Sequence, residues 1–216
     1  MTSRIAVLVS GRGSNLQAIL DAIANHTLDA EIVGVFSNKH DAPALQRVPP
    51  ALRWSAEGKS FPDRLAFDEA LGNAVAAVRP DWVVCAGYMR ILSDSFIDRF
   101  RGCLLNIHPS LLPKYRGLRT HARALAAGDA QHGASVHFLV PELDAGTVIA
   151  QTSIEVQPQD SPDSLAQRLL PLEHSLLVAS LQLVCAGRVS EQGDMAILDG
   201  QPLLKPLHLD STGRFS

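Results

Sequence analysis

An asparagine and a histidine close one of the apolar strands that the sequence predicts. The run Cys103–His108 reads CLLNIH, so Asn106 and His108 stand two positions apart and point to one face of the strand. An amide donates hydrogen bonds to an oxyanion, and an imidazole transfers protons. Pro109 follows, and ligands bind outside the carboxyl ends of strands in open parallel sheets. The pair is a candidate site, although either residue alone is more simply a satisfied polar group at a strand end.

An aspartate in a later loop is the candidate partner of this histidine. Asp144 lies in Pro141–Gly146, which reads PELDAG and connects two predicted strands. By itself it is an ordinary turn residue, because Asp-x-Gly is common turn chemistry. Beside His108, its carboxylate would favour the protonated imidazole and help to relay protons. The functional interpretation therefore depends on a distance that the sequence does not contain.

A glycine-rich turn near the start of the chain is a candidate anion site. It lies between a predicted strand and a predicted helix, where free N–H groups and the helix dipole favour an anion. Leu16 stands where a dinucleotide fingerprint has its third glycine, and a Walker lysine is absent, so the pattern indicates a monophosphate. A tight turn that merely needs glycine geometry fits the spacing equally well. The candidate residues are Gly11, Arg12, Gly13, Ser14 and Asn15.

Short apolar runs alternate with segments of helical periodicity along most of the chain. Ser14 and Gln17 match a capping box at the first helix, and Pro171 predicts a kink or a break in the last one. Prolines within residues 38–62 predict a short helix and irregular chain. The expected strands are Arg4–Ser10, Glu31–Ser37, Asp81–Ala86, Cys103–His108, Ala134–Val140, Thr147–Glu155 and, weakly, Met195–Leu198. The first expected helix begins at Ser14. The other expected helices cover Asp63–Val78, Asp94–Phe100, Arg119–Ala127 and Ser161–Cys185.

This order of elements predicts an α/β fold. A strand, a tight turn, a helix and a second strand form a βαβ unit, which implies an open, mostly parallel, twisted sheet with helices on both faces. The length of 216 residues suits one domain with a small extension. We expect a catalytic domain over residues 1–187, and a C-terminal extension over residues 188–216 packed on it.

Composition excludes several classes of protein. The net charge of −3 argues against a nucleic-acid binder. No apolar stretch is long enough to span a bilayer, and the N-terminus lacks a signal peptide's cleavage region, so a cytoplasmic location is expected. Three separated cysteines and eight histidines without ligand spacing predict buried free thiols and no metal site.

A long run beginning at the candidate strand end resembles a known signature. Leu105–Gly117 reads LNIHPSLLPKYRG and is similar to the N-I-H-P-S-L-L-P core of folate-dependent formyltransferases. Ser10–Leu16, reading SGRGSNL, resembles the phosphate loop of the glycinamide ribonucleotide transformylases within that group. Further matched segments are Gly87–Leu92, Gly133–Phe138, Glu142–Gly146 and Glu173–His174, so the resemblance spans nearly the whole chain.

The resemblance implies a Rossmann-like formyltransferase fold and a role for each matched residue. Asn106, His108 and Asp144 would be catalytic, and Glu173 would contact the ribotide that residues 11–15 hold by its phosphate. Arg64 would contact the acidic tail of the folate. The N-terminal half would bind the ribotide and the C-terminal half the folate. The implied folate-binding residues are Arg64, Met89, Arg90, Ile91, Leu92, Asn106, Val140, Pro141, Glu142 and Leu143.

The implied activity is formyl transfer from 10-formyltetrahydrofolate to 5-phosphoribosylglycinamide in purine biosynthesis, by a monomer or homodimer without metal. The amine attacks directly, so no nucleophilic side chain is required. Alternatives keep the folate site and change the acceptor to water, methionyl-tRNA or a nucleotide sugar amine. The acidic balance and the little room after Gly187 disfavour tRNA. A non-catalytic folate- or nucleotide-binding module is a further alternative, against which intact Asn106, His108 and Asp144 argue.

Overall fold

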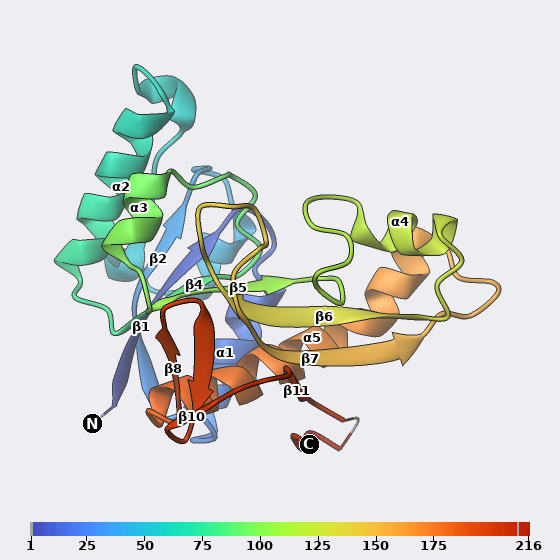
Figure 1. The fold of residues 1–216 in the computed structure, drawn as a ribbon. Helices are drawn as coiled ribbons and strands as arrows, with labels where there is room; N and C mark the ends of the chain where they lie inside the picture. Colours follow the sequence, from blue (N-terminus) through green and yellow to red (C-terminus); the bar gives the residue numbers. More distant parts are fainter. Residues whose placement is uncertain (1, 211) are drawn as a thin grey trace. The chain divides into compact units, whose positions relative to one another are not determined.

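The first apolar run of the chain forms the central strand of a parallel sheet. In the computed structural model, which describes residues 2–210 and 212–216, β1 (Ser3–Val9) pairs in parallel with β2 (Ala30–Ser37) on one side and β4 (Trp82–Cys85) on the other (Figure 1). β3 (Arg53–Ser55) adds to β2, and β5 (Leu104–His108) adds to β4, both also in parallel. In the order β3-β2-β1-β4-β5, the strands that follow β1 in the chain are added first on one side of it and then on the other. The carboxyl ends of β1 and β4 therefore form a topological switch point.

The chain divides into two compact units. The first comprises the chain up to Asn106 together with Leu139–Pro141, and the second comprises Ile107–Phe138 and Glu142–Ser216. β5 contains residues of both units. The predicted division at residue 187 between a catalytic domain and a C-terminal extension stays a prediction, as does the assignment of the ribotide to one half of residues 1–187 and of the folate to the other.

Three longer helices belong to the first unit. They are α1 (Ser14–Ala24), α2 (Arg64–Ala77) and α3 (Asp94–Arg99). Ala6 and Leu8 of β1 pack in one core with α2 and α3, and strand alternation directs Ile5 and Val7 to the opposite face, where they are also fully buried. A sheet buried on both faces explains why β1 reads as a continuous apolar run.

The predicted capping box at α1 is wrong. The N-cap is Gly13, in the left-handed region with φ 73°, and no side chain caps the helix. Ser14 is already the first helical residue, so its hydroxyl is not in the capping position. A Cβ on Gly13 would lie 2.5 Å from the Cβ of Ala44, so both the backbone conformation and the space require glycine here.

The proline-rich residues 38–62 form short helical turns and irregular chain, as predicted, but they also contain an unpredicted strand. Three 3₁₀ helices, η1 (Pro43–Arg47), η2 (Pro50–Leu52) and η3 (Gly58–Ser60), flank β3. Three residues are too few to show alternation, and β3 exists because Val35 pairs with Arg53 and Phe36 with Trp54. The Trp54 ring lies 6.2 Å from that of Phe67 of α2, which anchors β3 to the core.

The second unit is built on an antiparallel pair and a long helix. β6 (Gln131–Phe138) pairs with β7 (Val148–Glu155), and both contact α5 (Pro162–Cys185), which in turn contacts α4 (Thr120–Ala126). The predicted strand at Ala134–Val140 therefore begins earlier and ends two residues sooner. β6 begins at Gln131 because its pairing with Glu155 of β7 continues past the apolar residues.

Helix α5 is continuous through Pro171, so the predicted break is wrong. Ser161 Oγ accepts a hydrogen bond from Ser164 N, and Ser164 Oγ accepts one from Ser161 N, which fixes the start of the helix. Ser175 donates its hydroxyl hydrogen to the Pro171 carbonyl at 3.1 Å. Buried leucines on both sides of the proline hold α5 against the sheet, and this packing offsets the cost of one missing helical bond.

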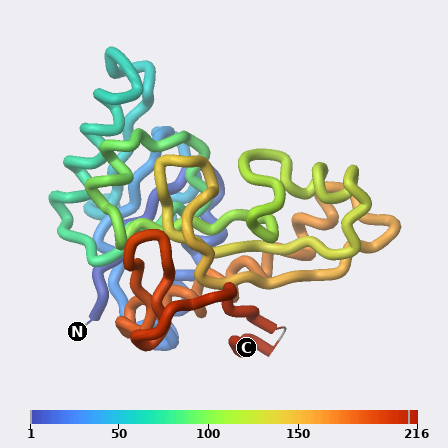
Figure 2. Tube along the Cα trace, viewed as in Figure 1, coloured from blue at the N-terminus to red at the C-terminus, as the bar shows by residue number. Residues whose placement is uncertain are grey.

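The C-terminal segment contains more strands than the single one predicted at Met195–Leu198. β8 (Val189–Gln192), β9 (Met195–Leu198) and β10 (Gln201–Pro202) form a small antiparallel sheet. β11 (Leu207–His208) joins β7 in parallel as an edge strand. The chain trace follows the hairpin of β8 and β9 into this edge strand (Figure 2). Strands of two to four residues arise from pairing and leave no periodic signal in the sequence.

The predicted fold class is confirmed. Eight strands form one mixed, mostly parallel sheet in the order β11-β7-β6-β5-β4-β1-β2-β3, with helices, in an α/β fold. Across residues 2–210 and 212–216, no helix is both long enough and apolar enough to cross a membrane.

Phe67 should be a main contributor to the stability of the first unit. Its ring is fully buried, 5.3 Å from the ring of Phe61, whereas Leu65 on the same helix is 59% exposed. We expect Phe67→Ala to lower the free energy of unfolding by about 3–5 kcal/mol, because a cavity remains. Leu65→Ala is the matched control and should change it by less than about 0.5 kcal/mol. Denaturant unfolding measures both, and equal losses would contradict this account of the core.

Candidate functional site

The glycine turn follows β1 at the switch point of the first unit. The Gly11 carbonyl accepts a hydrogen bond from Ala44 N at 3.1 Å, and the Arg12 carbonyl accepts one from Arg47 Nε at 2.9 Å. Both contacts come from η1 and fix the carbonyls of the turn. The first N–H groups of α1 lack acceptors within the helix, as in any α-helix. Arg12 is exposed, so this turn combines a cationic side chain with amide donors.

Ser10 joins this turn to the segment after β4. Its hydroxyl donates to Asn38 Oδ1 at 2.6 Å and accepts from Met89 N at 2.8 Å, and its own N–H donates to the Gly87 carbonyl at 3.1 Å. Sequence reasoning missed Ser10 and Asn38 as functional positions. The available signal was a small polar residue at the end of each of two adjacent buried strands.

The segment Met89–Leu92 divides its side chains between two environments. Met89 is 70% exposed and Ile91 58% exposed, which is unusual for large apolar residues, whereas Leu92 is buried. The guanidinium of Arg90 lies 4.4 Å from the centre of the Phe67 ring, and its Nε lies 3.8 Å from the buried carboxylate of Asp68. The side chain of Arg90 is thus directed into the protein, and only its backbone is left for a ligand.

The remaining predicted folate residues of the first unit lie in exposed or partly exposed positions. Arg64 is the first residue of α2, directly after Asp63, which caps that helix by accepting from Ala66 N at 2.8 Å. Arg64 is exposed, Val140 is half-buried and Pro141 is exposed. These positions are accessible to a ligand.

His108 and Asp144 meet in the second unit. His108 Nδ1 lies 3.4 Å from Asp144 Oδ2, with both side chains largely buried. Asp144 Oδ2 also accepts a hydrogen bond from Gly117 N at 2.8 Å. The distance that the sequence could not supply is therefore short. Asn106, two residues before His108 on β5, is only partly buried.

The surroundings of His108 suit a ring that donates from both nitrogens. Its Nε2 lies 3.0 Å from the Tyr115 carbonyl, which only accepts hydrogen bonds, so Nε2 carries a hydrogen. Its Nδ1 faces the carboxylate of Asp144. The ring of His108 therefore lies between two hydrogen-bond acceptors.

The chain is similar to known proteins over most of its length. The model of the formyl transferase family matches residues 3–181. The chain is 45% identical over 201 residues to phosphoribosylglycinamide formyltransferase of Escherichia coli, covering 92% of this chain and 95% of that protein.

The chain belongs to the formyl transferase family. The structure of phosphoribosylglycinamide formyltransferase from Coxiella burnetii superposes with a TM-score of 0.87 at 42% identity, covering 94% of this chain and 96% of that chain. A formyltetrahydrofolate deformylase from Pseudomonas syringae superposes with a TM-score of 0.82 at 25% identity, covering 92% of this chain and 66% of that chain. The fold therefore occurs with more than one formyl acceptor.

His137 is a further neighbour of Asp144 in this formyl transferase. Its Nδ1 donates to the Phe138 carbonyl at 2.8 Å, and its Nε2 lies 3.7 Å from Asp144 Oδ1. Burial lowers the pKa of His137, and the nearby carboxylate of Asp144 opposes this shift. Sequence reasoning gave His137 only as a supporting group in a matched segment, and its contact with Asp144 depends on a non-local approach.

Glu173 lies on α5 and is buried, only 8% exposed. A buried carboxylate is uncommon and points to a specific role. Pro171, two residues earlier, leaves Glu173 on the buried face of a continuous helix. Glu142 and Leu143, the last predicted folate residues, are exposed in the loop that carries Asp144, and Glu142 forms an ion pair with Arg116. Within residues 2–210 and 212–216, no three His, Cys, Asp or Glu side chains are grouped to hold a metal.

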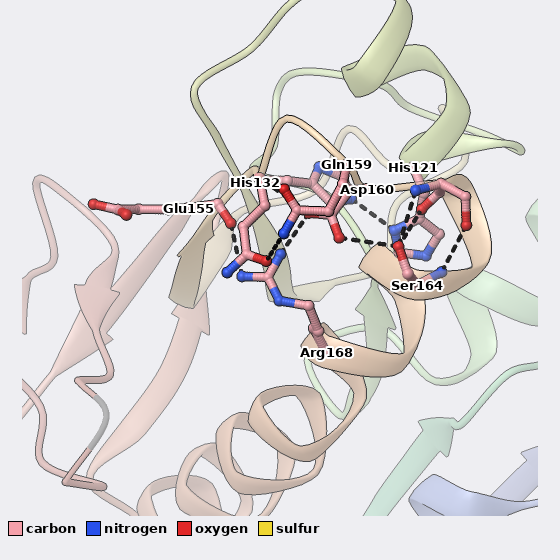
Figure 3. Close-up of polar contacts among 9 residues, drawn as sticks. His121, His132, Glu155, Gln159, Asp160, Ser164 and Arg168 are labelled. Carbon is pink, nitrogen blue, oxygen red and sulfur yellow. Dashed lines mark hydrogen bonds and ion pairs between the residues drawn. The ribbon is translucent and has the colours of Figure 1, made fainter.

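Two histidines outside the predicted site bond directly to each other. His132 Nε2 lies 2.9 Å from His121 Nδ1, so one nitrogen donates and the other accepts (Figure 3). Burial lowers the pKa of both rings, that of His132 to about 4. His121 lowers the pKa of His132 further, and His108 lowers that of His121. The pair is therefore neutral at pH 7, and it connects α4 with the start of β6.

The pKa of His132 predicts a specific acid sensitivity. The unfolded chain takes up this proton near pH 6.5, whereas the folded protein does so only near pH 4. Stability from this group is thus complete above about pH 6.5 and is lost as pH falls towards 4. We expect His132→Gln to flatten the pH dependence of the free energy of unfolding over that window. An unchanged slope would contradict the neutral assignment.

Proposed function

We propose that this formyl transferase moves the formyl group of 10-formyltetrahydrofolate to the amine of 5-phosphoribosylglycinamide. The products are formylglycinamide ribonucleotide and tetrahydrofolate, in de novo purine biosynthesis. The observation that carries the proposal is the largely buried pair of His108 and Asp144, 3.4 Å apart, in which His108 lies on the strand that also contains Asn106. The choice of acceptor is supported by the near full-length relatives named for it.

The catalytic step requires stabilisation of an oxyanion. The amine nitrogen attacks the formyl carbon, and the carbonyl oxygen becomes negative in a tetrahedral intermediate. The amide of Asn106 donates a hydrogen bond to that oxygen. A protonated His108 donates from Nδ1, which turns from Asp144 to the oxygen, because its Nε2 is held by the Tyr115 carbonyl. A preorganised donor of this kind contributes roughly 3–4 kcal/mol to the transition state.

The intermediate collapses when the bond between the formyl carbon and the folate nitrogen breaks. The attacking nitrogen must lose a proton and the folate nitrogen must gain one. Asp144, whose Oδ2 faces His108, is positioned to accept the first, and the His108 imidazolium can supply the second. The other carboxylate oxygen of Asp144, Oδ1, lies 3.7 Å from His137 Nε2.

The ribotide phosphate fits the amide donors and the arginine of residues 11–15. Asn15 fits a different part of the ribotide, because its Oδ1 is an acceptor that is buried without a hydrogen-bond partner among the described residues. An unsatisfied buried acceptor is costly, and a ligand hydroxyl or N–H would relieve it. Glu173 is the proposed contact for the ribose or amide of the ribotide.

The folate ring fits the exposed apolar side chains of Met89 and Ile91, together with the segment of residues 140–143. Arg64, exposed at the start of α2, fits the acidic tail. The folate is a co-substrate, and the proposal requires no metal. A cytoplasmic location, a monomer or homodimer, and the absence of nucleic-acid partners remain parts of this proposal.

A formyl-transfer assay with alternative acceptors tests the proposal. We expect tetrahydrofolate release to depend on glycinamide ribonucleotide, with little turnover when water or a nucleotide sugar amine is the only acceptor. Turnover with water alone would instead assign the deformylase reaction. Release of tetrahydrofolate that is indifferent to the ribotide would therefore overturn the proposed acceptor.

The two donors are tested by substitution. We expect Asn106→Ala and His108→Asn each to lower kcat by about 10²- to 10³-fold while folate binding persists, because the first removes an oxyanion donor and the second removes the proton-donating, charged ring. His26→Asn is the matched control, since His26 is exposed and has φ 59°, which asparagine tolerates. Steady-state kinetics and folate titration measure these effects. Turnover that survives both site substitutions would reject the assignment.

A further inference from the structure

The turn after His108 is held by two side chains from neighbouring strands of the second unit. Ser135 of β6 donates its hydroxyl hydrogen to the Ser110 carbonyl at 2.7 Å and accepts from Leu112 N at 3.1 Å. Gln151 of β7 donates from Nε2 to the Leu112 carbonyl at 2.9 Å and to the Ser135 hydroxyl at 2.8 Å. Both amide hydrogens of Gln151 are therefore used to hold this turn.

The directions of these bonds are fixed by the acceptors. Backbone carbonyls cannot donate, so the Ser135 hydrogen must go to Ser110 and the two Gln151 hydrogens must go to Leu112 and Ser135. Ser110 and Ser135 are fully buried. Each partner lost in such a network leaves another buried polar group unsatisfied, so the arrangement is strongly specified.

The same turn also fixes the backbone carbonyl that accepts a hydrogen bond from the ring of His108. Ser110 Oγ donates to the Lys114 carbonyl at 2.6 Å, and the next residue, Tyr115, supplies the carbonyl that accepts from His108 Nε2 at 3.0 Å. Displacement of the turn would therefore move the acceptor that orients the imidazole.

The turn packs tightly against β6. A Cβ on Gly133 would lie 2.0 Å from the Thr152 carbonyl and 2.7 Å from the side chain of Leu111. The backbone carbonyl of Gln151 accepts a hydrogen bond from Leu209 N of the C-terminal segment at 2.8 Å, beside β11. That segment lies beyond residues 3–181, which the family model matches.

We propose that Ser135 and Gln151 are positioning residues that orient the His108 ring through the turn Ser110–Tyr115. This proposal rests on the proposed function, in which His108 donates to the formyl oxygen. Small errors in the placement of a catalytic group are expensive, with about 10²-fold lost for a displacement near 1 Å. Ser135 and Gln151 thus affect catalysis without touching the substrate.

The decisive variant is Gln151→Met, which keeps the length of the side chain and removes both donors. We expect kcat to fall by about 10- to 100-fold, with the KM for the ribotide changed by less than about 3-fold, because the defect is in orientation rather than binding. We also expect the imidazole ¹⁵N resonances of His108 to shift in the unliganded protein, since the Nε2 hydrogen bond weakens.

Thr152→Val is the matched control. Thr152 is the next residue on β7, and its buried hydroxyl donates to the Leu209 carbonyl at 3.0 Å, away from the turn. This variant loses one buried hydrogen bond, so its Tm should fall. Its kcat and the His108 resonances should remain those of the wild type.

Ser135 provides an independent test if Gln151→Met does not fold. Ser135→Ala should reproduce the loss of kcat and the shifted resonances, and Ser135→Thr, which retains the hydroxyl, should restore most of both. The proposal is overturned if the folded donor-deleted variant keeps the kcat and the His108 resonances of the wild type. It is equally overturned if Thr152→Val, at the same Tm as the donor-deleted variant, loses as much kcat as that variant does.

The two readouts separate this proposal from the proposed function. Resonances of the unliganded protein do not depend on the identity of the acceptor. If the wild type does not formylate the ribotide but Gln151→Met still shifts the His108 resonances, the function is wrong and the positioning role stands. If the wild type is active and the resonances do not move, the positioning role fails alone.

Discussion

The carboxylate of Asp144 is the charge around which the second unit is arranged. A buried carboxylate is costly unless hydrogen bonds and opposite charge surround it. Gly117 N donates to its Oδ2, His108 Nδ1 faces the same oxygen, and His137 lies against Oδ1. Asp144 itself adopts φ 47°, a conformation that costs energy for a residue with a Cβ and that persists only where its surroundings enforce it.

Those surroundings come from a turn that is secured at several points. Tyr115 offers its carbonyl to His108, while its hydroxyl donates to Asp129 Oδ2 at 2.7 Å. Lys114 pairs with the same carboxylate at 2.9 Å, and Arg116 pairs with Glu142 in the Asp144 loop. Exposed ion pairs of this kind contribute little individually. The buried bonds of Ser135 and the partly buried bonds of Gln151 therefore carry more of the constraint, because solvent replaces them less readily.

The first unit satisfies a different requirement, which is to present backbone donors and apolar side chains at the ends of β1 and β4. Ser10 links the two strand ends through Asn38 and Met89. Asp68 and Arg90 sit beneath the exposed segment, and the backbone of Ser93 donates to Asp68 Oδ2 at 2.7 Å. Because these contacts hold the backbone of residues 89–92 on its buried side, the side chains of Met89 and Ile91 remain exposed.

Local sequence determined most of the elements and the positions where chemistry is possible. Apolar runs in β1, β4 and β5 and the periodicity of α2 were sufficient, because burial on a strand or helix face imposes a regular pattern. Tertiary structure alone decided which groups meet. The approach of Asp144 to His108, the inward direction of Arg90, the glycine cap of α1 and the pairing of β3 and β11 all arise from contacts between residues distant in the chain. Such contacts leave no local periodic signal, since each depends on how separate elements pack.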